Sequence, residues 1–374
     1  MLYIQNNHQE TKRREIFHFI IFKLFKTIGM KKVIKQVLGI DVAQKELVVC
    51  LAKKYDDWSE ETYFHKTFVN ATKGFEQMLQ WISKQTDINI PVNYVMEATG
   101  VYHECLAYYL RGRDQVVSIV LPNKISNYAR TLNVKTVTDR TASEAIAQFG
   151  LERKTDEWEK PLPLFKKMRQ LTRERGQVIM ERTMVKNELH AENAGVEPNK
   201  SSLTRCKKRI ELLTKQEKEI VIEIAALIKT EDAVSKLVKL LCSITGIGML
   251  TAAIILAETN GFDLIRNKRQ LTSFAGLDVK DHQSGTSVKG KPKISKRGNR
   301  FLRKAMHLPA LAAIRHDERF KGVFVRLVSK HGIKMKAAVA VQRKLLEMTY
   351  TIYKSNKKYD KEYFKNNAAV LTEI

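Results

Sequence analysis

Residues 33–54 read Val-Ile-Lys-Gln-Val-Leu-Gly-Ile-Asp-Val-Ala-Gln-Lys-Glu-Leu-Val-Val-Cys-Leu-Ala-Lys-Lys. Two runs rich in β-branched and aliphatic residues flank Ala43-Gln44-Lys45, which predicts two strands joined by a short turn. Asp41 lies in the first run, in what reads as the middle of a buried strand. A carboxylate there costs free energy unless it binds something. This stretch therefore predicts both the start of a sheet and a candidate site.

Further strands and helices follow in a regular order. Alternating or aliphatic runs predict strands at residues 63–69, 92–96 and 116–120, and helical patterns occur at 72–85, 102–111 and 122–130. Three hairpin-compatible strands followed by alternating helix and strand are typical of a ribonuclease H-like α/β domain. We expect this domain over residues 33–153.

Two more carboxylates stand at the ends of predicted elements. Glu97 ends a strand, and Asp139 directly precedes a helix. Taken singly, Asp41 could be a turn or strand-end acid, Glu97 a helix-start residue and Asp139 an N-cap. Three acids that converge at one end of a sheet would instead hold Mg²⁺, because hard cations prefer oxygen ligands and paired metals promote phosphodiester chemistry.

Two long, charge-rich helices are predicted next, at residues 165–190 and 203–229. The second has an a/d pattern with Glu217 as a polar exception, and Gly195 and Pro198 separate the two helices. An antiparallel hairpin within one chain and a coiled coil between chains fit this pattern equally well. We assign residues 154–236 to this helical connector.

A mostly α-helical domain is expected over residues 237–350. Two apolar helices meet at Thr245-Gly246-Ile247-Gly248, the pattern of a helix-hairpin-helix turn. Backbone N–H groups exposed by Gly246 and Gly248 could bind a DNA phosphate at the start of the second helix. A helical hairpin that only packs has the same sequence.

A serine precedes a strongly basic stretch in the same domain. We expect Ser284-Gly285 to lie in a flexible loop, with Ser287 as a second serine. In residues 289–304, which we name the basic segment, every charged side chain is positive. Such a cluster binds a polyanion through its phosphates and stabilises charge on a phosphorus under attack. A hydroxyl beside it is either a backbone contact or a nucleophile. The residues expected to contact the nucleic-acid backbone are Lys289, Lys291, Lys293, Lys296, Arg297, Arg300 and Arg303.

Composition narrows the class of protein. The net charge of +26 favours a nucleic-acid partner, with a basic membrane-surface protein as the competing interpretation. No charge-free apolar run of about 18 residues predicts a membrane span, so no membrane partner is expected. Four widely spaced cysteines lack metal-ligand spacing and fit a reducing cytoplasm. Residues 1–32 are expected to be an over-extended start before Met30 or disordered, and residues 351–374 a polar tail.

These motifs, in this order, resemble the DEDD transposases of bacterial insertion sequences, the insertion sequence 110 family. The resemblance implies a RuvC-like N-terminal domain with four acids that bind Mg²⁺, a coiled-coil connector and a C-terminal domain with a nucleophilic serine. Asp41, Glu97 and Asp139 match the first three acidic positions, and Ser284 matches the nucleophile. The family also implies DNA cut and rejoined through a phosphoserine, a dimer or tetramer, and a guide RNA from the element. The segments that carry the resemblance are Gly39–Val42, Glu97–Tyr102, Thr138–Gly150, Gly246–Gly248 and the segment that contains Ser284 and the basic residues after it.

One position departs from the family pattern. Asp-x-x-Asp-Ala is expected from Asp139 onward, but Ala142 occupies the place of the fourth acid. Glu144 lies two positions later, roughly 200° round a helix, and could substitute only if the helix start were rearranged. Losing one carboxylate weakens a metal site.

Three functions remain open at this point. The leading interpretation is a transposase, or site-specific DNA recombinase. A nucleic-acid-binding relic without catalysis is the second, because Ala142 would break the metal site. A metal-only nuclease resembling Holliday-junction resolvases is the third, with Ser284 as a passive phosphate contact. Ser284→Ala would abolish cleavage by the recombinase but not by the metal-only nuclease.

Overall fold

The computed structural model describes residues 31–98, 100–132, 136, 138–280, 283–284, 288–289 and 293–362. The chain divides into two compact units, Met1–Lys160 and Pro161–Ile374. Apart from residues 31 and 32, the predicted N-terminal segment lies outside the described residues, as do Ser287 and Lys291. Each unit is described by itself below.

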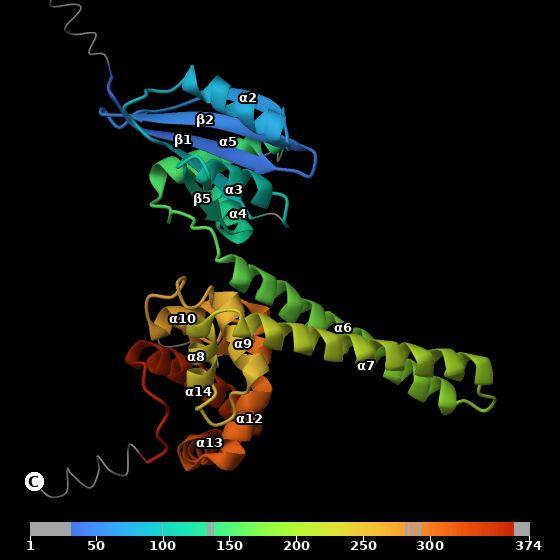
Figure 1. The fold of residues 1–374 in the computed structure, drawn as a ribbon. Coiled ribbons are helices and arrows are strands. Elements are labelled where there is room, and N and C mark those ends of the chain that lie inside the picture. The colour runs from blue at the N-terminus through green and yellow to red at the C-terminus, as the bar shows by residue number, and fades with distance from the viewer. Residues whose placement is uncertain are drawn as a thin grey trace, which may run out of the picture. The chain divides into compact units, whose positions relative to one another are not determined.

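A five-stranded mixed sheet forms the centre of unit 1 (Figure 1). The strand order is β3-β2-β1-β4-β5. The first three strands are antiparallel neighbours, whereas β4 runs parallel to β1 and to β5. This arrangement confirms the predicted ribonuclease H-like fold. The strands are β1 Val33–Val42, β2 Glu46–Tyr55, β3 Glu60–Val69, β4 Val92–Glu97 and β5 Val116–Val120.

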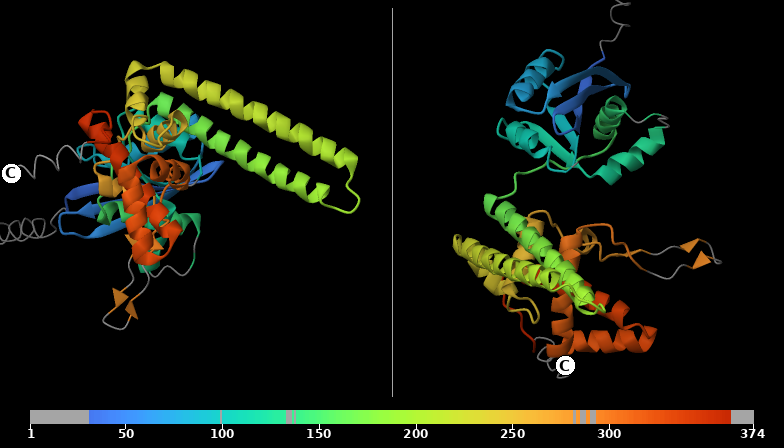
Figure 2. Two further views of the ribbon diagram at one scale, coloured as in Figure 1. Left: turned by 90° about the horizontal axis from the view of Figure 1, so that it is seen from below. Right: turned by 90° about the vertical axis from the view of Figure 1, so that its right-hand side faces the viewer.

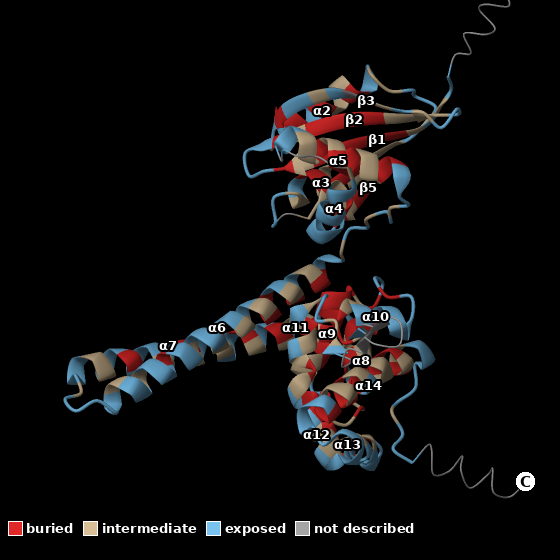
Figure 3. Ribbon diagram, turned by 180° about the vertical axis from the view of Figure 1, so that it is seen from behind, coloured by how far each residue is buried: buried red, intermediate tan, exposed pale blue. Residues whose placement is uncertain are grey.

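Helices cover both faces of this sheet. Side chains alternate between the faces along a strand, so Leu38 and Ile40 pack in one core and Val37 in another. The first core includes Phe75 of α2, and the second includes Ile146 of α5. Figure 3 shows the buried residues that run along β1 and β2. The helices of unit 1 are α2 Thr72–Ser83, α3 Glu104–Arg111, α4 Pro122–Ala129, the 3₁₀ turn η1 Arg130–Leu132 and α5 Asp139–Glu152.

The predicted position of Asp41 within its strand was wrong. Asp41 is the next-to-last residue of β1, and its exposure is intermediate. The apolar run misled the prediction because Val42 is buried although it ends the strand directly before the turn. Asp41 therefore lies near the rim of the sheet and not in its interior.

A long helical hairpin opens unit 2. Helices α6, Pro163–Asn193, and α7, Lys200–Lys229, pack on each other as a hairpin within one chain (Figures 1 and 2). This confirms the predicted hairpin, and pairing between chains stays a prediction. The polar exception Glu217 lies at their seam. Its carboxylate is 2.6 Å from Arg175 Nη2 and 2.6 Å from Arg182 Nη1, so two cations of α6 compensate its charge.

The remaining helices of unit 2 share one hydrophobic core with α6 and α7. Helix α14 continues to Ser355 with Ile352 buried, so the polar tail begins later than residue 351. Among the described residues, none belongs to a helix long and apolar enough to cross a membrane. The helices are α8 Asp232–Leu241, α9 Met249–Thr259, α10 Lys268–Phe274, α11 Arg300–Ala305, α12 His307–His316, α13 Glu318–His331 and α14 Lys334–Ser355.

Candidate active site

Strand register places two of the predicted acids at the same level. In the parallel pair β1–β4, Gly39 is opposite Val95 and Ile40 is opposite Met96. Continued by one residue, this register sets Asp41 beside Glu97 on strands about 4.8 Å apart. Both acids follow the alternation of Val37 and Val95, so they belong to the face that α5 covers.

Close packing of α5 on β1 brings in the third acid. A Cβ at Gly39 would lie 2.3 Å from the backbone N of Ala147 and 2.4 Å from the carbonyl oxygen of Ser143, so only glycine permits this approach. Similarly, a Cβ at Gly150 would lie 2.6 Å from Val37 Cγ1, so the helix also lies close to β1 at this residue. The helix thus runs along β1 with its N-terminal end toward Asp41, and Asp139 is its first residue.

The start of α5 is fixed by a capping box. The Thr138 side chain accepts a hydrogen bond from the Thr141 backbone N–H, and the Thr141 hydroxyl accepts one from the Thr138 N–H. The N-cap is therefore Thr138 and not Asp139, whose side chain is left exposed in the first turn. The N-cap explanation for Asp139 was wrong.

The three carboxylates influence one another electrostatically. Burial first, and then the charges of Asp139 and Glu97, raise the pKa of Asp41 from 3.8 to about 6. An all-carboxylate donor set whose members repel one another suits a hard divalent cation. Among the described residues, however, no three His, Cys, Asp or Glu side chains are grouped closely enough to hold a metal ion. The donors fit such an ion by chemistry, but their side chains are not gathered around a coordination site.

The missing fourth acid is not replaced by Glu144. Its Oε1 lies 2.7 Å from His65 Nε2 on β3 and 3.7 Å from Arg140 Nε. Ala142, at the family position, is half-buried in the first turn of α5. Glu144 therefore stabilises the packing of α5 on the sheet, and the acidic group has three members.

Ser284 belongs to a small β-ribbon in unit 2 (Figure 2). Strand β7, Gln283–Ser284, pairs with β8, Val288–Lys289, and β6, Val279–Lys280, pairs with β9, Lys293–Ile294. At the base of the ribbon, the Ser295 hydroxyl donates to Asp278 Oδ1 over 2.5 Å. The Ser284 backbone pairs with Val288, so Ser284 lies in a short strand and not in the predicted loop, and Gly285 lies outside the described residues.

The cations of the basic segment differ in accessibility. Lys293, Lys296, Arg297 and Arg300 are exposed. The half-buried Arg303 donates from Nη1 to the Ala275 carbonyl oxygen over 2.8 Å, so it holds the chain together at the turn after α10. Together with the exposed Lys304, five described cations of the basic segment thus remain accessible to a polyanion.

A buried carboxylate that the sequence analysis did not single out anchors the end of the basic segment. Glu258 of α9 is 2% exposed. It accepts two hydrogen bonds of 2.8 Å from the Arg173 guanidinium of α6 and one of 2.6 Å from Asn299 Nδ2. Asn299 also caps α11 through Leu302 N–H. The acid within an otherwise apolar helix was the signal that could have revealed it.

The two glycines of the helix-hairpin-helix turn have different environments. Gly246 has φ +94°, and a Cβ there would lie 2.3 Å from the Pro309 carbonyl oxygen. Gly248 is exposed at the N-cap of α9, with nothing within 4 Å of a Cβ. Gly246 is therefore required for packing against α12, and only Gly248 leaves backbone open to a ligand.

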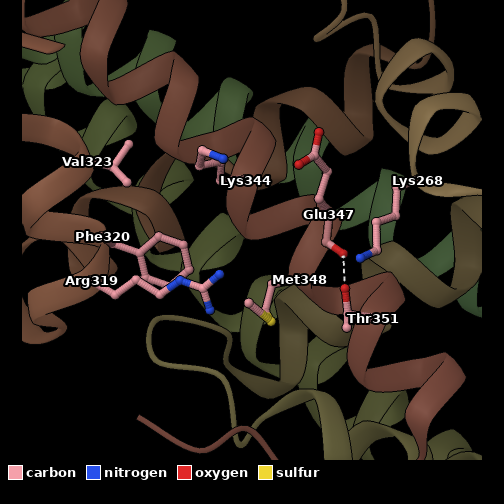
Figure 4. Close-up of a pocket in the computed structure, with 8 residues that line it drawn as sticks. All are labelled: Lys268, Arg319, Phe320, Val323, Lys344, Glu347, Met348 and Thr351. Atoms are coloured by element: carbon pink, nitrogen blue, oxygen red, sulfur yellow. Dashed lines mark hydrogen bonds between the residues drawn. The ribbon is translucent and has the colours of Figure 1, made fainter. Parts of the chain in front are cut away.

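A separate small pocket of about 100 Å³ lies among α10, α13 and α14 (Figure 4). Cations from three helices face it, together with Glu347, whose Oε1 accepts from Arg343 Nε over 2.9 Å. None of the predicted site residues contributes to it. The lining residues are Lys268, Arg319, Phe320, Val323, Lys344, Glu347, Met348 and Thr351.

Two transposase family models match successive parts of the chain. Residues 38–192 match a transposase family model of the DEDD, insertion sequence 110 type, and residues 238–324 match the model described as "Transposase IS116/IS110/IS902 family". The pilin gene-inverting protein of Moraxella bovis is 26% identical over 332 residues, which are 87% of this chain and 98% of that protein. The transposase for insertion sequence element IS1111A of Coxiella burnetii is 24% identical, over 75% of this chain and 78% of that protein.

Among solved structures, Thermus thermophilus RuvC in complex with a Holliday junction substrate is similar over 33% of this chain and 99% of the RuvC chain. The TM-score is 0.26 and the sequence identity 8%. The two family models together span both the acidic group and the helices that flank Ser284. The chain belongs to the insertion sequence 110 family of transposases.

Proposed function

We propose that this transposase cuts and rejoins DNA with a Mg²⁺-dependent acidic site and Ser284 as the nucleophile. The observation that carries the proposal is the convergence of Asp41, Glu97 and Asp139 at one end of the sheet, on the face covered by α5. Burial of Asp41 first, and then repulsion from Asp139 and Glu97, raise the pKa of Asp41, and a bound cation would favour its charged form.

In this proposal Asp41, Glu97 and Asp139 hold the metal. A bound Mg²⁺ would supply Lewis-acid stabilisation of negative charge on the DNA phosphate. Ser284 Oγ attacks the phosphorus, a serine–phosphorus bond forms, and one bridging DNA oxygen leaves and takes up a proton while the serine proton passes to solvent. Attack by a DNA hydroxyl on the phosphoserine then restores the serine and rejoins the DNA.

The basic segment binds the DNA backbone in this scheme. The exposed Lys293, Lys296, Arg297 and Arg300 neutralise phosphates, and Gly248 offers backbone N–H groups at the start of α9. Lys289 and Lys291 belong to the same basic segment in the sequence, and we assign them the same role. We extend the proposal to a dimer or tetramer that acts in the cytoplasm, with target choice by a guide RNA, from the family resemblance.

A specific observation favours a second candidate function. Ala142 removes the fourth acid, and Glu144 is engaged by His65. A chain with a weakened metal site would bind nucleic acid without cutting it, as a relic of a transposase.

One experiment separates the two functions. The native chain, Ala142→Asp and Ser284→Ala are incubated with Mg²⁺, the element's end sequences and RNA transcribed from its flanks, and protein–DNA adducts are captured under denaturing conditions. An adduct with the native chain that is absent with Ser284→Ala supports the serine mechanism. An adduct with Ala142→Asp alone supports the inactivated copy. If neither chain forms one on DNA that it binds, the serine mechanism is contradicted, and cleavage by Ser284→Ala would favour a metal-only nuclease.

A further inference from the structure

The acids at the end of the sheet are followed by two different loops. Asp41 is followed by Val42 and the β1–β2 turn, and Glu97 is followed by the loop into α3. Strand pairing fixes the two strands up to Ile40 and Met96. Beyond that point Asp41 stays paired with Val48 of β2 and Glu97 with Val120 of β5, and the loops that follow the two acids are joined to each other by a further contact.

One side chain bridges these loops. Asn70 Nδ2, just past the end of β3, donates to the Ala43 carbonyl oxygen over 2.9 Å and to the Tyr102 carbonyl oxygen over 3.2 Å. The Asn70 backbone N–H also donates to the Lys45 carbonyl oxygen over 2.9 Å. A single amide nitrogen is thus shared between the turn after Asp41 and the loop after Glu97.

The orientation of the Asn70 amide is determined by its neighbours. Both of its partners are carbonyl oxygens, which can only accept, so the nitrogen and not the oxygen must face them. Asn70 Oδ1 is buried without a hydrogen-bond partner among the described residues. A buried unpartnered acceptor is costly, and its presence here is explained by the use of both amide hydrogens on the two loops.

We propose that Asn70 is a positioning residue for the acidic site, because its amide ties the turn that follows Asp41 to the loop that follows Glu97. The inference rests on the proposed metal site and adds a residue that none of the acidic motifs contains. Asn70 holds the two loops from outside the carboxylate group. Groups that orient metal ligands in this indirect way commonly change metal affinity by ten- to a hundredfold when removed.

The test compares the full-length native chain with four variants, of which Asp41→Asn removes a carboxylate of the proposed metal site itself. Asn70→Ala removes the bridge, and Asn70→Asp keeps the shape of the side chain but has no hydrogen to donate to either carbonyl. Asn89→Ala is the matched control, since Asn89 is an exposed loop asparagine whose amide donates to Asp87 within its own loop. Mn²⁺ affinity is measured by electron paramagnetic resonance, with Mg²⁺ as competitor, and hydrogen exchange is followed over residues 42–46 and 100–104 without metal.

We expect Asn70→Ala to accelerate exchange in both segments together and to weaken Mn²⁺ binding by about tenfold or more. Asn70→Asp should bind no better than Asn70→Ala, although it adds a carboxylate to an acidic region. Asn89→Ala should match the native chain in both measurements. Native exchange in Asn70→Ala, or native Mn²⁺ affinity in Asn70→Asp, would overturn the inference.

Failure of the proposed metal site itself gives a different result. In that case the native chain and Asp41→Asn would bind Mn²⁺ equally weakly, which overturns the proposed function and the role of Asn70 together. Failure of the Asn70 inference alone leaves native affinity well above that of Asp41→Asn, with the Asn70 variants indistinguishable from the native chain.

Discussion

Oε1 of Glu144 lies 2.7 Å from Nε2 of His65, where α5 packs against β3. Arg140 Nε approaches the same oxygen at 3.7 Å. Glu144 is therefore already bound on the sheet side of α5 and does not take part in the acidic group. The acidic group of this chain has three carboxylates, whereas the family pattern has four. Ala142 stands at the position of the fourth.

Restoring the fourth acid should strengthen metal binding. Ala142 follows Asp139 by three residues in the first turn of α5, so the two positions share a helix face. We expect Ala142→Asp to raise Mg²⁺ affinity on the order of tenfold, measured by isothermal titration calorimetry. Ala142→Asn, which has a similar shape but no charge, is the control. Equal affinities in all three chains would show that residue 142 is not a ligand position.

Stability without metal should fall as pH rises through the titration of Asp41. The folded pKa, about 6, lies above the ordinary value of 3.8, so the native state binds more protons than the unfolded state between these values. The contribution of Asp41 to the stability of the fold is therefore fully present below about pH 4. It is lost as the pH rises from about 4 to just above 6. In EDTA, Asp41→Asn should lack this decline and melt at a higher temperature at pH 8.

Added Mg²⁺ should make the melting temperature of the native chain higher than that of Asp41→Asn, the reverse of the order expected in EDTA. The native chain gains stability because the cation binds only the folded state, whereas Asp41→Asn gains little. A native melting temperature that does not respond to Mg²⁺ at pH 8 would contradict the assignment of Asp41 as a ligand.

Two arginines of the basic segment should respond differently to substitution. Arg300 is exposed, whereas Arg303 donates to the Ala275 carbonyl oxygen. Arg300→Ala should reduce the slope of log affinity against log salt by about 1 on DNA, as expected for one lost phosphate contact. Arg303→Ala should lower thermal stability and leave the slope nearly unchanged. The opposite pattern in fluorescence-anisotropy titrations would refute this division.

The glycine pair in the α8–α9 turn offers a second matched comparison. Gly246→Ala forces a Cβ against Pro309 at φ +94° and should destabilise unit 2 by about 2 kcal/mol or more. Gly248→Ala meets open space and should cost less than about 1 kcal/mol. Chemical denaturation measures both. Similar losses for the two variants would mean that the tight packing at Gly246 is not what requires glycine.

Removing the charge of Glu258 should damage unit 2 more than removing a surface acid. Glu258→Gln leaves the Arg173 guanidinium without its carboxylate, and we expect a loss of about 2–4 kcal/mol, moderated because Arg173 is 43% exposed. Glu223→Gln, in an exposed pair with Lys167, should cost about 0–1 kcal/mol. Comparable unfolding free energies for these two variants would contradict the anchoring role of Glu258.

The sequence by itself determined the strands, the long helices and the acids. Nearly continuous apolar runs in residues 33–54 and 92–97 reflect burial on both faces of a sheet, and this local pattern is visible in the sequence. It also singled out Asp41, Glu97, Asp139 and the basic segment, because charged residues within or beside apolar runs are visible without a structure, although it placed Asp41 in the middle of its strand. The absence of a fourth acid at Ala142 was equally visible.

Only the tertiary structure decided which of these residues meet and which are engaged elsewhere. The β1–β4 register and the contact of α5 with Gly39 bring the acids to one edge, through pairings between residues far apart in sequence. The same kind of contact assigns Glu144 to His65 and turns Asn70 into a bridge between two loops. Hydrogen bonds and close packing of this kind depend on three-dimensional proximity, which side-chain periodicity along the chain does not encode.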